Sequence, residues 1–199
     1  MKDSLSAQLA AAAARLVVEE GMEYGPAKRK AARVLGRGGT LRNRELPRND
    51  DVEDEVRTYL QLFCAETQPV ELAALRAVAL RWMERLAEFR PHLTGAVWRG
   101  TATRLNNVHL QLFCDDSKAA EIALINEGVD YESASKPGPR GEPINVLCVH
   151  TPCRELGEAV TIQLSVLDHD DLRGALKPDA SGRTERGDLA ALRRLLGAA

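Results

Sequence analysis

Three scarcities in the sequence narrow what this chain of 199 residues can be. Aromatic residues make up only 4% of it, so a core must be built mainly from aliphatic side chains and alanine. No run of about 18 apolar residues occurs, which predicts that no helix crosses a membrane. The 27 basic residues face 29 acidic ones, a balance that excludes the global positive charge of a dedicated nucleic-acid binder. The composition therefore predicts an ordinary folded protein.

Cysteine is also rare, and its four copies are widely spaced. Such spacing is typical of reduced thiols in the cytoplasm rather than of a disulfide framework. Cys148, His150 and Cys153 are the one grouping that could suggest a zinc site. Their spacing is not that of a zinc knuckle, and no second pair of ligands lies at a matching separation. We therefore expect no bound metal there.

Several familiar motifs are missing as well. The sequence has no Gly-x-x-x-x-Gly-Lys-Ser/Thr phosphate loop, which disfavours an ATPase of that type. The alanine-rich stretch at 7–14 leads directly into Arg15, Glu19 and Glu20, so it lacks the long apolar core and cleavage site of a secretory signal. We expect a helix of a cytoplasmic protein at this place.

The periodicity of apolar residues divides the chain into two parts and predicts an α+β protein. Residues 1–90 are helical in character, whereas residues 91–199 alternate in the manner of strands with helices between them. The expected helices lie at 7–21, 26–35, 51–66, 69–89, 117–126 and 188–196, with Ser117 as the cap of the fifth. The expected strands lie at 97–98, 108–113, 145–149 and 159–167.

A glycine-rich motif precedes the strand expected at 108–113. It reads Gly95-Ala96-Val97-Trp98-Arg99-Gly100-Thr101-Ala102, and Asn107-Val108-His109 follows five residues later. The spacing resembles that of the minimal nucleotidyltransferases, in which a Gly-Ser turn, an Arg-Gly pair and an Asp-hydrophobic-Asp strand follow one another. Gly95-Ala96 takes the place of Gly-Ser, Arg99-Gly100 that of Arg-Gly, and Asn107 and His109 those of the two aspartates. The resemblance covers about residues 90–170.

This resemblance implies a mixed sheet of nucleotidyltransferase type with flanking helices, and a nucleotide-binding cleft formed by Gly95, Arg99, Gly100, Asn107 and His109. The family holds magnesium with its paired carboxylates, because magnesium prefers hard, anionic oxygen ligands. Here the two positions share a strand face but offer an amide and an imidazole. The sequence therefore predicts a catalytically degenerate binding or regulatory module, for which no cofactor is expected.

The first alternative to a degenerate module is an active nucleotidyltransferase with displaced carboxylates, in which Asp115, Asp116 and Asp168 could hold Mg²⁺. More simply, the first two precede an expected helix, and acidic residues favour the positive end of its dipole. Asp168 ends a strand, where a solvated turn is the simpler interpretation.

A basic segment in the helical part is the second feature of interest. Between residues 25 and 48 lie eight basic residues and one acidic residue, Glu45. Such a cluster is typical of phosphate binding and predicts a nucleic-acid or other polyanion partner. Helices 14–25 and 27–36 resemble the opening of a tetracycline-repressor-type DNA-binding domain, although a glycine-rich loop replaces its recognition helix. A DNA-binding transcriptional regulator is therefore the second alternative function. The simpler interpretation of the basic residues is a solvated surface of the folded protein. The sequence leaves open whether the protein forms a homodimer. The candidate nucleic-acid-binding residues are Lys28, Arg29, Lys30, Arg33 and Arg37.

Overall fold

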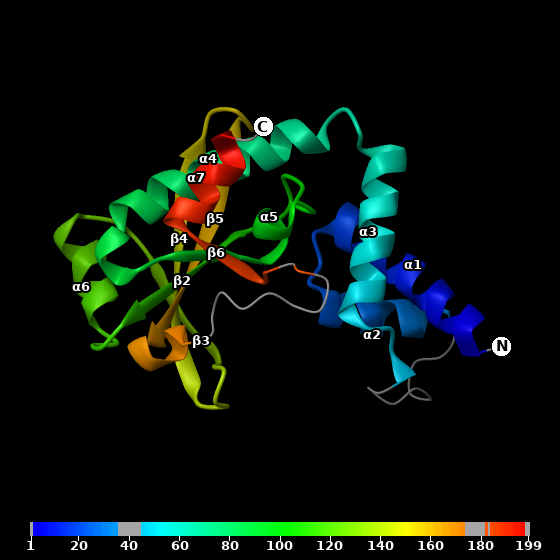
Figure 1. The fold of residues 1–199 in the computed structure, drawn as a ribbon, viewed down its shortest axis with the longest axis horizontal. Coiled ribbons are helices and arrows are strands. Elements are labelled where there is room, and N and C mark those ends of the chain that lie inside the picture. The colour runs from blue at the N-terminus through cyan, green and yellow to red at the C-terminus, as the bar shows by residue number, and fades with distance from the viewer. Residues whose placement is uncertain (1, 36–44, 174–181, 183, 198–199) are drawn as a thin grey trace. The chain divides into compact units, whose positions relative to one another are not determined.

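Figure 1 shows the computed structural model, which describes residues 2–35, 45–173, 182 and 184–197. The protein is α+β, as the sequence predicts, with helices that flank a mixed sheet. Among the described residues, no helix combines the length and the apolar character that a membrane crossing needs.

The described helices begin and end within a few residues of most of the expected ones. They are α1 (Lys2–Glu20), α2 (Tyr24–Val34), α3 (Asn49–Phe63), α4 (Gln68–Arg85), α5 (Gly95–Arg99), α6 (Ala119–Asn126) and α7 (Leu189–Gly197). Two short 3-10 turns, η2 (Ala87–Phe89) and η3 (His169–Leu172), follow α4 and β5.

Six strands form one sheet within the described residues. They are β1 (His92–Thr94), β2 (Val108–Cys114), β3 (Glu132–Pro137), β4 (Pro143–Cys153), β5 (Glu158–Asp168) and β6 (Arg186–Asp188). Their order is β3-β4-β5-β2-β1-β6, in which β2 and β5 are parallel and all other neighbours are antiparallel. The expected strands at 108–113, 145–149 and 159–167 are confirmed, while β1, β3 and β6 were not predicted.

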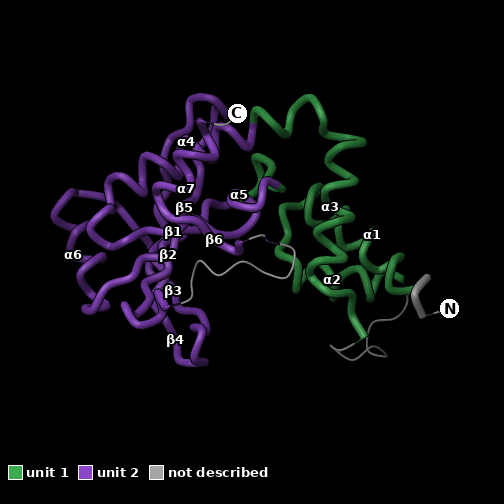
Figure 2. Tube along the Cα trace, in the orientation of Figure 1, with its two compact units in different colours: residues 1–70, 101–106 green, residues 71–100, 107–199 purple. Residues whose placement is uncertain are grey.

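The chain divides into two compact units, drawn in different colours in Figure 2. The first contains residues 1–70 and 101–106, and the second contains residues 71–100 and 107–199. The sequence suggested a division at residue 90. In the structure, most of α4 lies in the unit that contains the sheet rather than with the helices before it. The short stretch 101–106 belongs to the first unit although both of its neighbours in the chain belong to the second.

Alanine and valine dominate the core of the first unit, where α1 packs against both α2 and α3. Small side chains let helix axes approach closely, which suits a chain with few aromatic residues. Fully or almost fully buried residues of this core are Leu9, Ala10, Ala13, Ala14, Val17, Ala27, Ala31, Val52 and Val56.

The two faces of the sheet in the second unit differ. One face is apolar and buried, and it contains Leu93, Leu110, Leu112, Ile162, Leu164, Leu147 and Val149. This confirms the alternation predicted for residues 108–113. The other face is half-exposed along one row, in which Gln163, His109, Thr94 and Arg186 lie side by side on β5, β2, β1 and β6. This polar row is the feature that positions the candidate site.

Helix α4 connects the other helices of the second unit. Its Glu84 accepts a hydrogen bond from Arg193 of α7 at 2.7 Å, and its Arg85 pairs with Glu127 at the end of α6. The residues that α4 buries, among them Leu75, Val78 and Met83, are those at helical spacing in the sequence. Helix α4 therefore links α6 and α7 within the second unit.

Two local predictions are wrong. Val97 and Trp98 lie in helix α5 rather than in a strand, because the chain makes a helical turn between the antiparallel strands β1 and β2. Ser117 does not cap α6, which begins at Ala119 after an N-cap at Lys118. Tertiary packing decides both places, since a helix as short as the five residues of α5 has little stability of its own.

Candidate functional site

The glycine motif brings the end of β1 against the start of β2. Gly95 opens α5 in a left-handed conformation with φ +74°, and a Cβ added to it would lie 3.3 Å from Cδ2 of His109. Two of the predicted nucleotide-binding residues, Gly95 and His109, are therefore in contact. Thr94 stands directly across from His109 in the β1–β2 ladder, so its side chain shares that face of the sheet.

A half-buried arginine, Arg76, which no sequence pattern singled out, holds the other end of this motif. Arg76 of α4 donates from Nε to the carbonyl oxygen of Val97 at 3.1 Å and from a terminal nitrogen to that of Trp98 at 3.3 Å. Burial lowers the pKa of Arg76, although an arginine stays protonated at neutral pH. Its charge stabilises the carbonyl end of α5, where Gly100 turns the chain with φ +82°. Arg99 and Gly100 are thus held at the far end of the turn from Gly95.

The candidate site also includes Arg186 of the neighbouring strand β6. Arg186 faces Thr94 in the ladder, and its guanidinium donates to Oε1 of Gln111 at 2.7 Å. Gln111 lies two residues beyond His109 on the same face of β2. The site thus combines the hydroxyl of Thr94, the imidazole of His109 and the amide of Gln111 with the guanidinium of Arg186. Asn107 is half-buried directly before β2.

The three candidate carboxylates lie at the other end of the sheet. Asp115 and Asp116 follow the last residue of β2, and Asp168 ends β5 opposite Cys114. Six residues of extended strand separate His109 from Asp115, which corresponds to about 20 Å. Carboxylates at that distance cannot bind a metal ion held beside His109.

The same three carboxylates lie near Cys114, and two of them cap local turns. Burial first, and then the negative charges of Asp116, Asp115 and Asp168, raise the pKa of the Cys114 thiol, which places all four near one another. Asp116 accepts a hydrogen bond from the backbone N–H of Lys118 ahead of α6, and Asp168 accepts one from that of Asp170 as the cap of η3. Among the described residues, no group of three or more His, Cys, Asp or Glu side chains could hold a metal ion.

The grouping at 148–153 is divided by the pleat of β4. Cys148 and His150 point to one face of the strand, whereas Cys153 is buried on the other. His150 shares a hydrogen bond of 3.0 Å with the hydroxyl of Thr161, and Cys153 donates from Sγ to Glu155. This geometry does not fit a zinc site, because the three side chains cannot meet at one ion.

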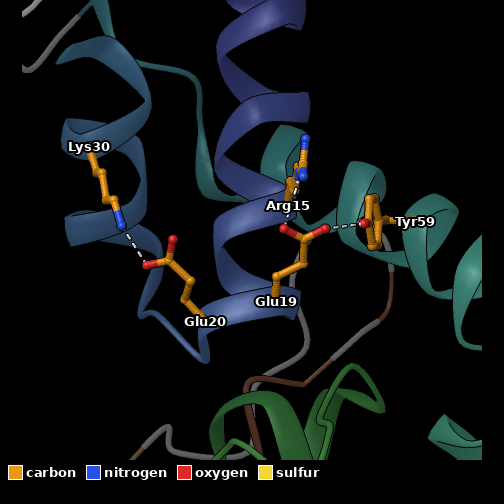
Figure 3. A network of polar contacts seen from close by, with 5 residues as sticks. All are labelled: Arg15, Glu19, Glu20, Lys30 and Tyr59. Atoms are coloured by element: carbon orange, nitrogen blue, oxygen red, sulfur yellow. Dashed lines mark hydrogen bonds and ion pairs between the residues drawn. The ribbon is translucent and has the colours of Figure 1, made fainter. Parts of the chain in front are cut away.

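In the first unit, Figure 3 shows where part of the basic segment makes its contacts. Lys30 pairs with Glu20 at 2.5 Å, and Lys28 donates to Pro47 O and to Asn49 Oδ1 at 3.1 and 2.8 Å. Arg29 and Arg33, one helical turn apart on α2, are exposed. Arg37 lies outside the described residues. Of the five predicted nucleic-acid-binding residues, two are therefore engaged within the unit.

The polar network in Figure 3 also joins α1 to α3. Glu19 accepts hydrogen bonds from Tyr59 Oη at 2.6 Å and from Arg15 Nε at 2.9 Å. The bond from Tyr59, and then that from Arg15, lowers the pKa of Glu19. The helix after the basic segment, α3, opens with exposed Asp50, Asp51 and Asp54. A helix with this charge is repelled by phosphates, so it is not suited to lie in a DNA groove as a recognition helix would.

Sequence reasoning missed Arg76, Gln111 and Arg186. Their roles depend on contacts between residues 21 to 75 positions apart in the chain, which no local pattern encodes. A comparison of the chain with models of known protein families found no match, and a comparison with curated proteins found none either.

Proposed function

We propose that the second unit is a catalytically degenerate, nucleotidyltransferase-like binding or regulatory module, which takes a phosphate-bearing ligand such as a nucleotide at the junction of Gly95 and β2. The contact between Gly95 and His109 carries this proposal, because the sequence pattern of the enzymes that the motif resembles has a metal-binding aspartate at the position of His109. An imidazole and the neighbouring amide of Asn107 can donate hydrogen bonds to phosphate oxygens, but they do not supply the anionic oxygens that magnesium requires.

The donor set also argues against the alternative of an active enzyme with displaced carboxylates. Asp115, Asp116 and Asp168 lie about 16 Å or more along the strands from His109, and two of them bind backbone N–H groups. Magnesium therefore does not fit this site, and the proposal includes no transfer step. The cytoplasmic location expected from the sequence remains part of the proposal, and the four free cysteines are consistent with it.

Calorimetric titration with ATP, in EDTA and in excess Mg²⁺, tests the proposal. We expect the wild-type protein to bind ATP in EDTA without turnover. The double variant Asn107→Asp/His109→Asp restores two carboxylates on one strand face, so it should bind Mg²⁺ and lose ATP affinity in EDTA. The matched control Asn126→Asp/His150→Asp adds the same two charges at exposed positions of the same unit and should behave like the wild type. Release of pyrophosphate by the wild-type protein, or equal Mg²⁺ affinity in all three proteins, would contradict the proposal.

A polyanion partner for the first unit is the second candidate function. The exposed pair of Arg29 and Arg33 on one face of α2 favours it, because neither takes part in the hydrogen bonds of Lys28 or in the ion pair between Lys30 and Glu20. The acidic start of α3 favours a flexible or single-stranded polyanion over a DNA groove as the ligand.

A further inference from the structure

We propose that Arg186 is the phosphate-recognition residue of this site, and that it takes the role of counter-charge which a metal ion has in the resembling enzymes. This inference rests on the proposed function, since it concerns the same ligand-binding face. It goes further because it names the charged group, which lies in the C-terminal part of the chain outside the glycine motif.

The register of three strands places Arg186 at the site. Arg186 of β6 stands across from Thr94 of β1, and Thr94 stands across from His109 of β2. The guanidinium reaches over β1 to Gln111, so it lies about one pleat repeat, or roughly 7 Å along β2, from His109. A triphosphate or diphosphate group spans a distance of this order, so one ligand could contact both residues.

The hydrogen bonds of Arg186 leave its charge available. Its partner Gln111 is a neutral amide, and its Nε is buried without an acceptor in the part of the chain that the structure describes. The nearest acidic residue on its strand face, Asp188, accepts the backbone N–H of Ala191 at 2.7 Å and so caps α7. A partly buried guanidinium whose one side-chain partner is neutral favours an anion, and its planar fork fits two phosphate oxygens at once.

Three contacts hold β6 in this position before any ligand binds. Trp98 donates from Nε1 to the carbonyl oxygen of Thr184 at 2.8 Å, and Thr94 donates from its hydroxyl to that of Glu185 at 3.0 Å. The indole of Trp98 also lies directly on Gly187, where a Cβ would be 2.1 Å from its Cη2. Arg186 is thus fixed by its neighbours on both sides, which reduces the entropy lost on binding.

Calorimetric titration with inorganic pyrophosphate in EDTA tests this inference. Charge-assisted hydrogen bonds from arginine correspond to about ten- to hundredfold in affinity, so Arg186→Gln should weaken binding by that factor. Arg186→Lys keeps the charge but not the fork, and it should lose less. Gln111→Glu gives the guanidinium an internal carboxylate at hydrogen-bond distance, so it should also weaken binding while the fold is preserved. Gln61→Glu, an equal change at an exposed position of α3, should bind as the wild type does.

The outcomes separate this inference from the proposed function. The role of Arg186 would be overturned if the wild type, Arg186→Gln and Gln111→Glu bound pyrophosphate with equal affinity. That result would not affect the proposed function, which the ATP titration tests separately. Loss of pyrophosphate binding in these variants, with no ATP binding by the wild type, would support the role of Arg186 and contradict a nucleotide ligand. A wild-type protein that binds no pyrophosphate would refute the inference directly.

Discussion

Replacement of Gly187 by alanine is the sharpest test of how the sheet edge is built. In the native protein, the hydrogen atoms of Gly187 leave room for the indole of Trp98. An alanine Cβ would lie 2.1 Å from Cη2 and 2.3 Å from Cζ3 of that ring, whereas carbon atoms pack at about 3.5 Å. Either the indole or strand β6 must therefore move by more than about 1 Å.

Both movements have a cost that can be approximated. Forcing an additional methyl group into a well-packed region costs about 1–3 kcal/mol, and the lost hydrogen bond from Trp98 to Thr184 O adds about 1 kcal/mol. We expect Gly187→Ala to lower the free energy of unfolding by about 2–4 kcal/mol. Because β6 also carries Arg186, the same variant should bind pyrophosphate more weakly.

Urea unfolding followed by tryptophan fluorescence measures this effect, because both tryptophans, Trp82 and Trp98, belong to the second unit. The matched control makes Gly187→Ala in a Trp98→Leu background, where the smaller side chain removes the clash. There the alanine should cost less than about 0.5 kcal/mol. A wild-type midpoint for Gly187→Ala alone, or an equal cost in both backgrounds, would refute the close packing of Trp98 on this glycine.

Three further outcomes are expected. Burial of His92 lowers its pKa, although the hydrogen bond to the Arg90 carbonyl opposes this shift, so the free energy of unfolding should fall as the pH decreases below about 6.5. Between pH 7 and pH 5 the urea midpoint of His92→Phe should therefore fall less than that of the wild type, and an equal fall in both proteins would contradict this role of His92. Arg29→Ala/Arg33→Ala should elute from heparin at lower salt than the wild type, and unchanged elution would remove the polyanion proposal. Leu112→Ala should lower the free energy of unfolding in urea by about 2–4 kcal/mol, because Leu112 is fully buried. A decrease of less than about 1 kcal/mol would contradict the burial of Leu112 in the core.

The pentapeptide Leu-Gln-Leu-Phe-Cys shows how much of the fold the sequence predicts. It occurs at 60–64 and at 110–114, and the structure places the first copy at the end of α3 and the second in β2. The flanks decide correctly in both places. Apolar residues at helical spacing precede the first copy, whereas Val108 and Leu110 begin an alternation that the second completes. Local periodicity is therefore sufficient where an element is long enough and buries one face, whereas the six exposed residues of β3 show no such pattern.

Short elements and long-range partners were not accessible in this way. Three-residue strands such as β1 and β6 depend on their pairing partners: β6 pairs with β1, which lies more than 90 residues earlier in the chain, and β1 pairs with both β6 and β2. Likewise, the resemblance of the glycine motif implied that Gly95 and His109 line one cleft, but the motif contained no information about Arg186. The distance of Asp168 from His109 also depended on β2 and β5 being parallel neighbours.

The stretch 101–106 has a practical consequence for dissecting the molecule. The first unit takes these residues from within the sequence of the second, and Gln68 donates from Nε2 to the carbonyl oxygen of Ala102 at 2.9 Å. A truncation after residue 70 would remove that acceptor, and a fragment beginning at residue 71 would carry an orphaned loop with two buried threonines, Thr101 and Thr103. Neither half can be obtained intact with a single cut, so experiments on either unit require the whole chain.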